Sequence, residues 1–71
     1  METVRLHTEF IKLESLLKYC GHCLTGGEAK GLIAEGKVSV NGEVCTQRGR
    51  KIHDRDQVSA EGRQYVVKYT G

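Results

Sequence analysis

The chain contains no proline and no tryptophan, and its only aromatic residues are three tyrosines and one phenylalanine. The absence of proline excludes a cis-proline turn and a proline-rich recognition segment. The scarcity of aromatic rings argues against a surface that recognises single strands by stacking bases. No apolar run is long enough to cross a membrane, and no basic segment followed by an apolar core marks a signal peptide. We therefore expect a cytoplasmic protein that has no membrane partner.

The length and composition predict one small folded domain. A chain of 71 residues is expected to form a single domain, residues 1–71, around a thin hydrophobic core. Charged residues make up 28% of the sequence and hydrophobic residues 38%, which is typical of a globular rather than a disordered chain. The three cysteines are an odd number in a chain without a secretory signal, so reduced thiols are expected rather than a disulfide framework.

Basic residues are concentrated in the last third of the chain. The formal net charge is only +2, but six of the eleven Lys and Arg residues follow Cys45, against three of the nine acidic residues. Four of these cations lie between Arg48 and Arg55. This asymmetry favours an anionic partner, whereas the simpler interpretation of the same segment is a solvated surface loop.

A first short helix is predicted after Phe10 and Ile11. Apolar residues at i, i+3, i+4 and i+7 over residues 13–20 form one stripe, and Gly21 is a suitable stop. Preceding this helix, residues 1–9 show weak alternation that predicts a short edge strand or an ordered arm.

A second helix is predicted to begin at Thr25, because Thr25 and Glu28 form the capping box T-x-x-E. The apolar stripe over residues 29–36 repeats the spacing of the first helix, so the two helices are predicted to pack face to face as a hairpin. Gly26 and Gly27 weaken the first turn. Either the backbone approaches the first helix or a phosphate at this point, or the turn is simply flexible.

The second half of the chain is predicted to form strands. Asn41-Gly42 lies between alternating segments and is the strongest short signal for a hairpin, because both turn positions require a positive φ. A second hairpin is predicted around Glu61-Gly62. Two helices followed by a run of strands indicate the α+β class.

Most of the chain resembles a known family. The residues that carry the resemblance are Lys12-Leu13-Glu14-x-x-Leu17, then Glu28-Ala29-Lys30-x-x-Ile33-x-x-Gly36-Lys37-Val38-x-Val40-Asn41-Gly42, and finally Asp56-x-Val58. This pattern, from about Phe10 to Val58, resembles the RNA-binding domain named after small-subunit ribosomal protein S4, also called the alpha-L RNA-binding motif. Gly-Gly-Glu-Ala-Lys and Arg-Gly-Arg-Lys make the chain most similar to the small stand-alone bacterial members, the YbcJ type.

The resemblance implies a two-helix hairpin packed on a small bent antiparallel sheet of about four to five strands, with RNA across the helices and the adjoining strand and loop. Lys12, Lys30 and Lys37 match basic positions of the family. Many members have an arginine at the start of the second helix, where this chain has glycine, so the basic loop is expected to supply that charge. The candidate RNA-binding residues are Lys12, Tyr19, Gly26, Gly27, Lys30, Lys37, Arg48, Arg50, Lys51 and Arg55.

The predicted function is non-enzymatic binding of structured RNA, ribosomal or transfer RNA, mainly through phosphate contacts. Clustered Lys and Arg side chains neutralise phosphates and release counterions without recognising bases. No catalytic residues, cofactor or metal are predicted. We expect a monomer, with a ribosome or an RNA-modifying protein as a further partner. An adaptor that binds an acidic protein through the same surface is an alternative hypothesis.

A second alternative is a thiol or zinc protein built on Cys20-Gly21-His22-Cys23. C-x-x-C motifs support disulfide exchange and supply two zinc ligands, which Cys45 with His22 or His53 could complete. The redox motif normally opens a helix, whereas Cys20 belongs to the apolar stripe at a helix end, and a second closely spaced ligand pair is missing. Cys20 is therefore predicted to be a core residue and Cys23 a link residue.

Overall fold

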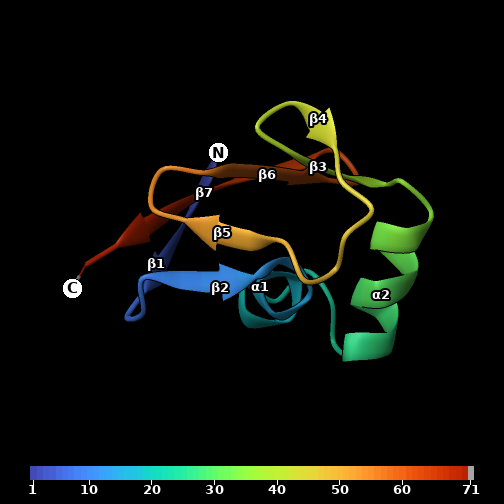
Figure 1. Ribbon diagram of the computed structural model, residues 1–71, viewed down its shortest axis with the longest axis horizontal. Coiled ribbons are helices and arrows are strands. Elements are labelled where there is room, and N and C mark those ends of the chain that lie inside the picture. The colour runs from blue at the N-terminus through green and yellow to red at the C-terminus, as the bar shows by residue number, and fades with distance from the viewer. Residues whose placement is uncertain (71) are drawn as a thin grey trace.

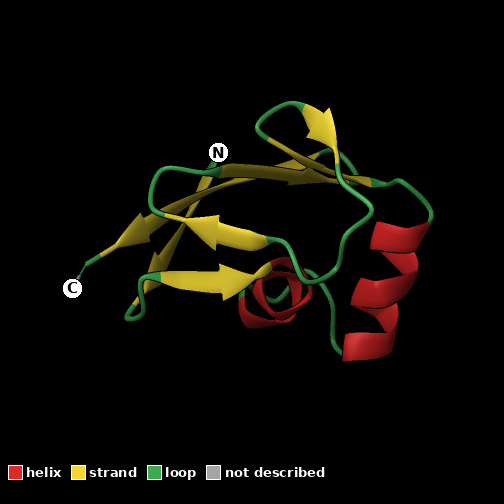
Figure 2. Ribbon diagram, viewed as in Figure 1, coloured by secondary structure: helices red, strands yellow, loops and turns green. Residues whose placement is uncertain are grey.

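The computed structural model describes residues 1–70, which form two helices and two sheets (Figures 1 and 2). The elements in chain order are β1 (Glu2–Leu6), β2 (Phe10–Lys12), α1 (Leu13–Tyr19), α2 (Gly26–Ala34), β3 (Val38–Val40), β4 (Glu43–Val44), β5 (Lys51–His53), β6 (Gln57–Ala60) and β7 (Arg63–Tyr69). The α+β class is confirmed. No helix within the described residues is long and apolar enough to span a membrane.

The main sheet has five strands in the order β1-β7-β6-β3-β4. The hairpins β3–β4 and β6–β7 are antiparallel, and β3 and β6 join them through a further antiparallel pair. β1 is an edge strand, but it pairs with β7 in parallel, with Val4 opposite Val67. The sheet is therefore mixed, and the prediction of a purely antiparallel sheet is wrong. Alternation fixes which residues of β1 face the core, but it does not fix the direction of the strand.

A separate two-stranded ribbon, β2–β5, joins the start of α1 to the middle of the chain. Phe10 and Ile11, which were expected to lead directly into the helix, form strand β2 instead. Ile11 lies opposite Ile52, and both pack on the core, where Ile52 is fully buried. Because successive side chains of a strand point to opposite faces, the neighbouring positions face outward. These outward residues are Phe10, Lys12, Lys51 and His53.

The predicted helical stripes are confirmed, and the two helices pack against each other as predicted, with crossed axes. Leu13, Leu16 and Leu17 of α1 are fully buried, as are Ala29 and, within 1%, Ile33 of α2. In Figure 1, α1 is viewed nearly end-on and α2 from the side, so the two axes cross. The hydrophobic core joins residues of both helices to β1, β3, β5, β6 and β7 in one cluster.

The turn predictions agree with the backbone. Asn41 and Gly42 have φ values of 51° and 86°, and Glu61 and Gly62 have 50° and 82°, so both hairpins use left-handed turn residues. Thr25 Oγ1 accepts a hydrogen bond from the N–H of Glu28 (3.2 Å), which confirms the predicted cap. The hairpins β3–β4 and β6–β7 therefore lie where the turn residues predicted them.

Candidate nucleic-acid interface

The loop between β4 and β5 is fixed to the first turn of α1 by its own backbone. The carbonyl of Arg50 accepts a hydrogen bond from the N–H of Leu13 (2.8 Å), and the carbonyl of Arg48 accepts one from Glu14 (3.1 Å). The first N–H groups of a helix have no partner within the helix, so the loop satisfies donors that would otherwise need water. Figure 2 shows the chain passing from β4 down to α1 before it enters β5. A loop that is distant in sequence is thereby held against the helix start.

This arrangement gathers four cations, here named the basic cluster: Lys12, Arg48, Arg50 and Lys51. Lys12 lies directly opposite Lys51 in the β2–β5 ribbon, where Cβ atoms are about 4.5–5.5 Å apart. Arg48 and Arg50 are placed beside Lys12 by their bonds to the next two residues of the chain. All four side chains are exposed. Within residues 1–70, none of the four forms an ion pair with an acidic side chain.

Several other cations are neutralised by acidic neighbours. Lys37 Nζ lies 3.9 Å from Glu35, and Arg55 Nε lies 3.6 Å from Asp54. Arg63 is bound to Glu2, and this hydrogen bond raises the pKa of the guanidinium. A cation that already has a carboxylate neighbour adds less positive potential to the surface than an unpaired one. The basic cluster is therefore a region where positive charge remains uncompensated.

The remaining candidate residues are distributed over other parts of the molecule. Lys30 is exposed on α2, and Lys37 is exposed between α2 and β3. Arg55 belongs to the β5–β6 turn, at the end of β5 away from α1 (Figure 1). Its φ of 72° is held by a bond from its N–H to the carbonyl of Val67 (2.7 Å). The structure thus brings together the cluster, but it does not bring Arg55 into it.

The glycines at the start of α2 lie in open space. A Cβ atom at Gly26 would meet nothing within 4 Å, and one at Gly27 would meet only Thr25 Oγ1 at 3.8 Å. Of the alternatives considered for Gly26 and Gly27, a close packing against α1 is therefore not what the structure shows. The Glu28 carboxylate accepts a bond from the N–H of Leu24 (3.2 Å), one residue earlier than an ideal capping box. This negative charge beside the first turn weakens its attraction for a phosphate.

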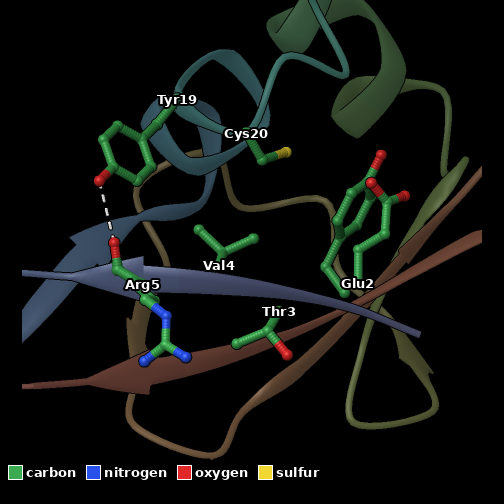
Figure 3. Close-up of a pocket in the computed structure, with 7 residues that line it drawn as sticks. Glu2, Thr3, Val4, Arg5, Tyr19 and Cys20 are labelled. Carbon is green, nitrogen blue, oxygen red and sulfur yellow. Dashed lines mark hydrogen bonds between the residues drawn. The ribbon is translucent and has the colours of Figure 1, made fainter.

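Tyr19 lies at the other end of α1 from the basic cluster. Its hydroxyl donates a hydrogen bond to the backbone carbonyl of Arg5 (2.9 Å), which fixes α1 to the edge strand β1. Figure 3 shows Tyr19 turned towards this carbonyl, while Cys20 points into the shallow pocket between α1 and β1. The structure gives Tyr19 a role in covering a sheet edge, where unpaired carbonyls would otherwise be exposed.

Phe10 and His53 are surface residues that the sequence analysis did not select. They lie opposite each other in the β2–β5 ribbon, with ring centroids 6.0 Å apart, and Phe10 is 38% exposed. Lys51 Nζ lies 4.8 Å from the centre of the Phe10 ring. The sequence signal was weak, because Phe10-Ile11-Lys12 has two apolar residues in a row and is too short to distinguish a strand from the approach to a helix.

The Cys-Gly-His-Cys segment is part of the packing between the helix link and the β6–β7 turn. His22 is held by Tyr65 Oη (2.7 Å from Nδ1) and by Glu61 Oε1 (2.9 Å from Nε2). Burial, followed by the nearby Glu28 and Glu61 carboxylates, raises the pKa of the Cys23 thiol. A nucleophilic thiol requires the opposite shift, because the thiolate is the reactive form.

The metal alternative lacks a ligand set. Among residues 1–70, no three His, Cys, Asp or Glu side chains are placed to hold one metal ion. Both ring nitrogens of His22 are already occupied by protein partners. Cys20, predicted to be a core residue, is only partly buried against the core, whereas Cys23, predicted to be a link residue, is 2% exposed and belongs to the core.

Two crossed helices on a mixed sheet, with a loop of cations fixed to the start of α1, define a small α+β domain with a basic surface. The comparison with protein families agrees with this description. The family model of the S4 domain matches residues 4–68. The chain belongs to the S4 domain family.

Individual relatives cover most of the chain. It is 39% identical over 59 residues, 83% of each sequence, to the "Probable ribosome maturation protein RlbA" of Bacillus subtilis (strain 168). The solution structure of YbcJ from E. coli, described as revealing an alfaL motif involved in RNA-binding, matches 96% of this chain and 87% of its own. That match has a TM-score of 0.74 and 38% identity.

A more distant structure shares the fold alone. The 30S ribosomal protein S4e from Thermoplasma acidophilum matches 83% of this chain, with a TM-score of 0.64 and 19% identity. The match covers 31% of the S4e chain, so only part of that larger protein corresponds to the present one.

Proposed function

We propose that this protein binds structured RNA, with ribosomal RNA as the favoured ligand, through phosphate contacts made by the basic cluster. We also propose that it acts without catalysis. The single observation that carries the proposal is the attachment of the β4–β5 loop to α1, which holds Arg48 and Arg50 beside Lys12 and Lys51. Four unpaired cations at one place attract a phosphate backbone and release its counterions. The arginines also offer bidentate contacts to phosphate oxygens.

The relatives support the choice of RNA. YbcJ carries a motif described as involved in RNA-binding, and the B. subtilis relative is named for ribosome maturation. Lys30, Lys37 and the open backbone at Gly26 and Gly27 extend the proposed surface along α2, with weaker contacts than the cluster. Tyr19 and Arg55 are peripheral in this proposal. A monomeric, cytoplasmic protein that meets RNA on a ribosome or beside an RNA-modifying enzyme fits this function.

The test is the salt dependence of RNA binding by a triple variant, Arg48→Ala, Arg50→Ala and Lys51→Ala. Each phosphate contact that is lost should reduce the slope of log K against log salt by about one and weaken all RNA sequences about equally. Binding of fragments of ribosomal RNA should be measured by filter retention or gel shift over a range of salt concentrations.

A matched control removes three exposed cations outside the cluster: Arg5→Ala, Lys18→Ala and Lys68→Ala. Both triple variants change the net charge by the same amount. If the proposal is correct, the control keeps most of the affinity and the full salt slope. Equal loss in the two variants would mean that net charge alone attracts RNA. An unchanged cluster variant would refute the role of the loop.

The alternative of an adaptor for an acidic protein is separated by nuclease treatment. Partners recovered with the tagged protein from a cell extract should be lost after RNase digestion if RNA is the ligand. A protein partner that remains after digestion, and that requires the basic cluster, would favour the adaptor.

A further inference from the structure

We propose that the outward face of the β2–β5 ribbon holds one unpaired base of the bound RNA, stacked on Phe10 beside the basic cluster. This inference rests on the proposed function and specifies it, because it identifies the RNA feature as a bulge or a frayed end rather than a continuous duplex. The scarcity of aromatic residues in the sequence argued against such a site. The structure nevertheless places two rings and two ammonium groups on one small surface.

The register of the ribbon creates this surface. Phe10 lies opposite His53, and Lys12 lies opposite Lys51, so all four side chains share the face that points away from the core. The buried pair Ile11 and Ile52 fixes the register, because a slip by one residue would bring Phe10 and the lysines into the core. The rings are therefore held in place by packing on the opposite face of the same ribbon.

The register makes position 10 face outward, but it does not require an aromatic side chain there. Phe10 is 38% exposed, although phenylalanine is among the residue types most often buried. His53 completes a pair of tilted rings, with an interplanar angle of 44°. Flat, partly exposed rings beside cations are the features with which proteins stack unpaired bases, and they accept any base because every base has a π face.

Lys51 couples stacking to phosphate binding. Its ammonium group covers the Phe10 ring in the free protein, at 4.8 Å from the ring centre. A phosphate attracts an ammonium group more strongly than the ring does, because the contact is a charge-assisted hydrogen bond. When RNA approaches, the ammonium moves to the phosphate, and the exposed face of the ring becomes available to a base.

The dimensions of the ribbon suit one nucleotide. The ring pair and the lysine pair are two residues apart along each strand, about 7 Å. A base on Phe10 therefore keeps its own phosphate within reach of Lys12 and Lys51, and the neighbouring phosphates extend towards Arg48 and Arg50. A fully paired helix cannot use the ring in this way, since its bases are already stacked on one another.

The absence of tryptophan from the chain allows a direct test, because Phe10→Trp creates a single fluorescent reporter. The probes are two hairpin RNAs that differ by one bulged purine. We expect strong quenching of the indole emission by the bulged hairpin and little by the fully paired one. The comparison variant Tyr19→Trp, at the other end of α1, should respond weakly to both RNAs. Gel shifts on the same samples establish that each RNA is bound.

A second variant measures the contribution to affinity. Phe10→Leu keeps an apolar side chain but removes the ring, and stacking on an aromatic residue contributes enough to change Kd by about 5- to 150-fold. We expect Phe10→Leu to weaken the bulged hairpin by at least about 5-fold and to leave the paired hairpin unchanged. Phe10→Tyr should bind both RNAs as the natural protein does.

The outcomes separate this inference from the proposed function. Bound RNA without quenching in the Phe10→Trp variant, or equal affinity of Phe10→Leu for the bulged hairpin, overturns stacking and leaves phosphate binding intact. Quenching in the Tyr19→Trp variant instead of the Phe10→Trp variant also overturns it. A natural protein that binds neither hairpin, at any salt concentration, removes the proposed function together with the stacking site.

Discussion

Lys12 and Lys51 face each other across the β2–β5 ribbon, and within residues 1–70 neither has an acidic partner. Lys12→Glu should therefore make the protein more stable while it weakens RNA binding. Like charges directly opposite each other destabilise a strand pair, and an opposite-charge pair contributes about 0.2–1 kcal/mol. The substitution removes the first effect and adds the second. The expected gain is therefore about 1 kcal/mol at low salt.

The gain should be visible as a rise in Tm. For a domain of this size, about 1 kcal/mol corresponds to a shift of about 4–8 °C. Thermal unfolding followed by circular dichroism should be compared at about 0.01 M and about 1 M salt, where the Debye lengths are about 30 Å and 3 Å. The difference between Lys12→Glu and the natural protein should be largest at low salt and mostly disappear at high salt.

Lys18→Glu is the matched control, because it makes the same charge change at an exposed position of α1, outside the β2–β5 ribbon. It places two glutamates four residues apart, Glu14 and position 18, and should lower stability by about 0.2–0.5 kcal/mol. RNA affinity should fall more for Lys12→Glu than for Lys18→Glu. If Lys12→Glu does not raise Tm at low salt, or raises it equally at high salt, repulsion between Lys12 and Lys51 does not destabilise the ribbon, and the prediction is wrong.

Two further predictions concern stability. Asn41 joins the β3–β4 turn to β6, since its amide donates to Asp56 Oδ1 (3.1 Å) and accepts from the N–H of Gln57 (2.9 Å). Asn41→Ala should lower the free energy of unfolding, measured in urea, by about 2–3 kcal/mol, because it removes two hydrogen bonds and places alanine in a left-handed conformation. Asn41→Gly should lower it somewhat less, because glycine adopts that conformation without strain. Burial raises the pKa of both Cys23 and Tyr65, so the unfolded chain loses these protons first. The free energy of unfolding should be constant below about pH 8.5 and fall above it, and Cys23→Ala should make this fall smaller. A free energy of unfolding that does not change between about pH 8 and 11 would show that the two buried groups do not link folding to pH.

The sequence alone predicted the parts of the fold that depend on neighbouring residues. Each of these features involves only a few neighbouring residues, so hydrophobic periodicity and turn chemistry predict it directly. They are the stripe from Leu13 to Cys20, the Thr25 cap and the Asn41-Gly42 turn. The same local logic failed at Phe10 and Ile11, because three residues are too few to show a period. It also failed for the direction of β1, because alternation is the same in parallel and antiparallel strands.

The candidate site was predicted only in part. Arg48, Arg50 and Lys51 were visible as a charge run, and Lys12 entered through the resemblance to a family. Their meeting at the start of α1 could not be predicted from the chain, since it depends on hydrogen bonds between residues 13–14 and 48–50. For the same reason the sequence did not separate Lys37, which has a glutamate neighbour, from the cations of the basic cluster, which have none among residues 1–70.

By itself the sequence determined the helices, the hairpins, the α+β class and the presence of excess positive charge, because each of these follows from composition and from spacings of a few residues. The tertiary structure decided which cations lie together, which side chains face outward on the ribbon, and that Phe10 is beside them rather than in the core. The physical reason is that strand pairing and helix capping here join residues that lie 34–43 positions apart. No local pattern specifies a partner at that separation, and only the packing of the whole core selects it.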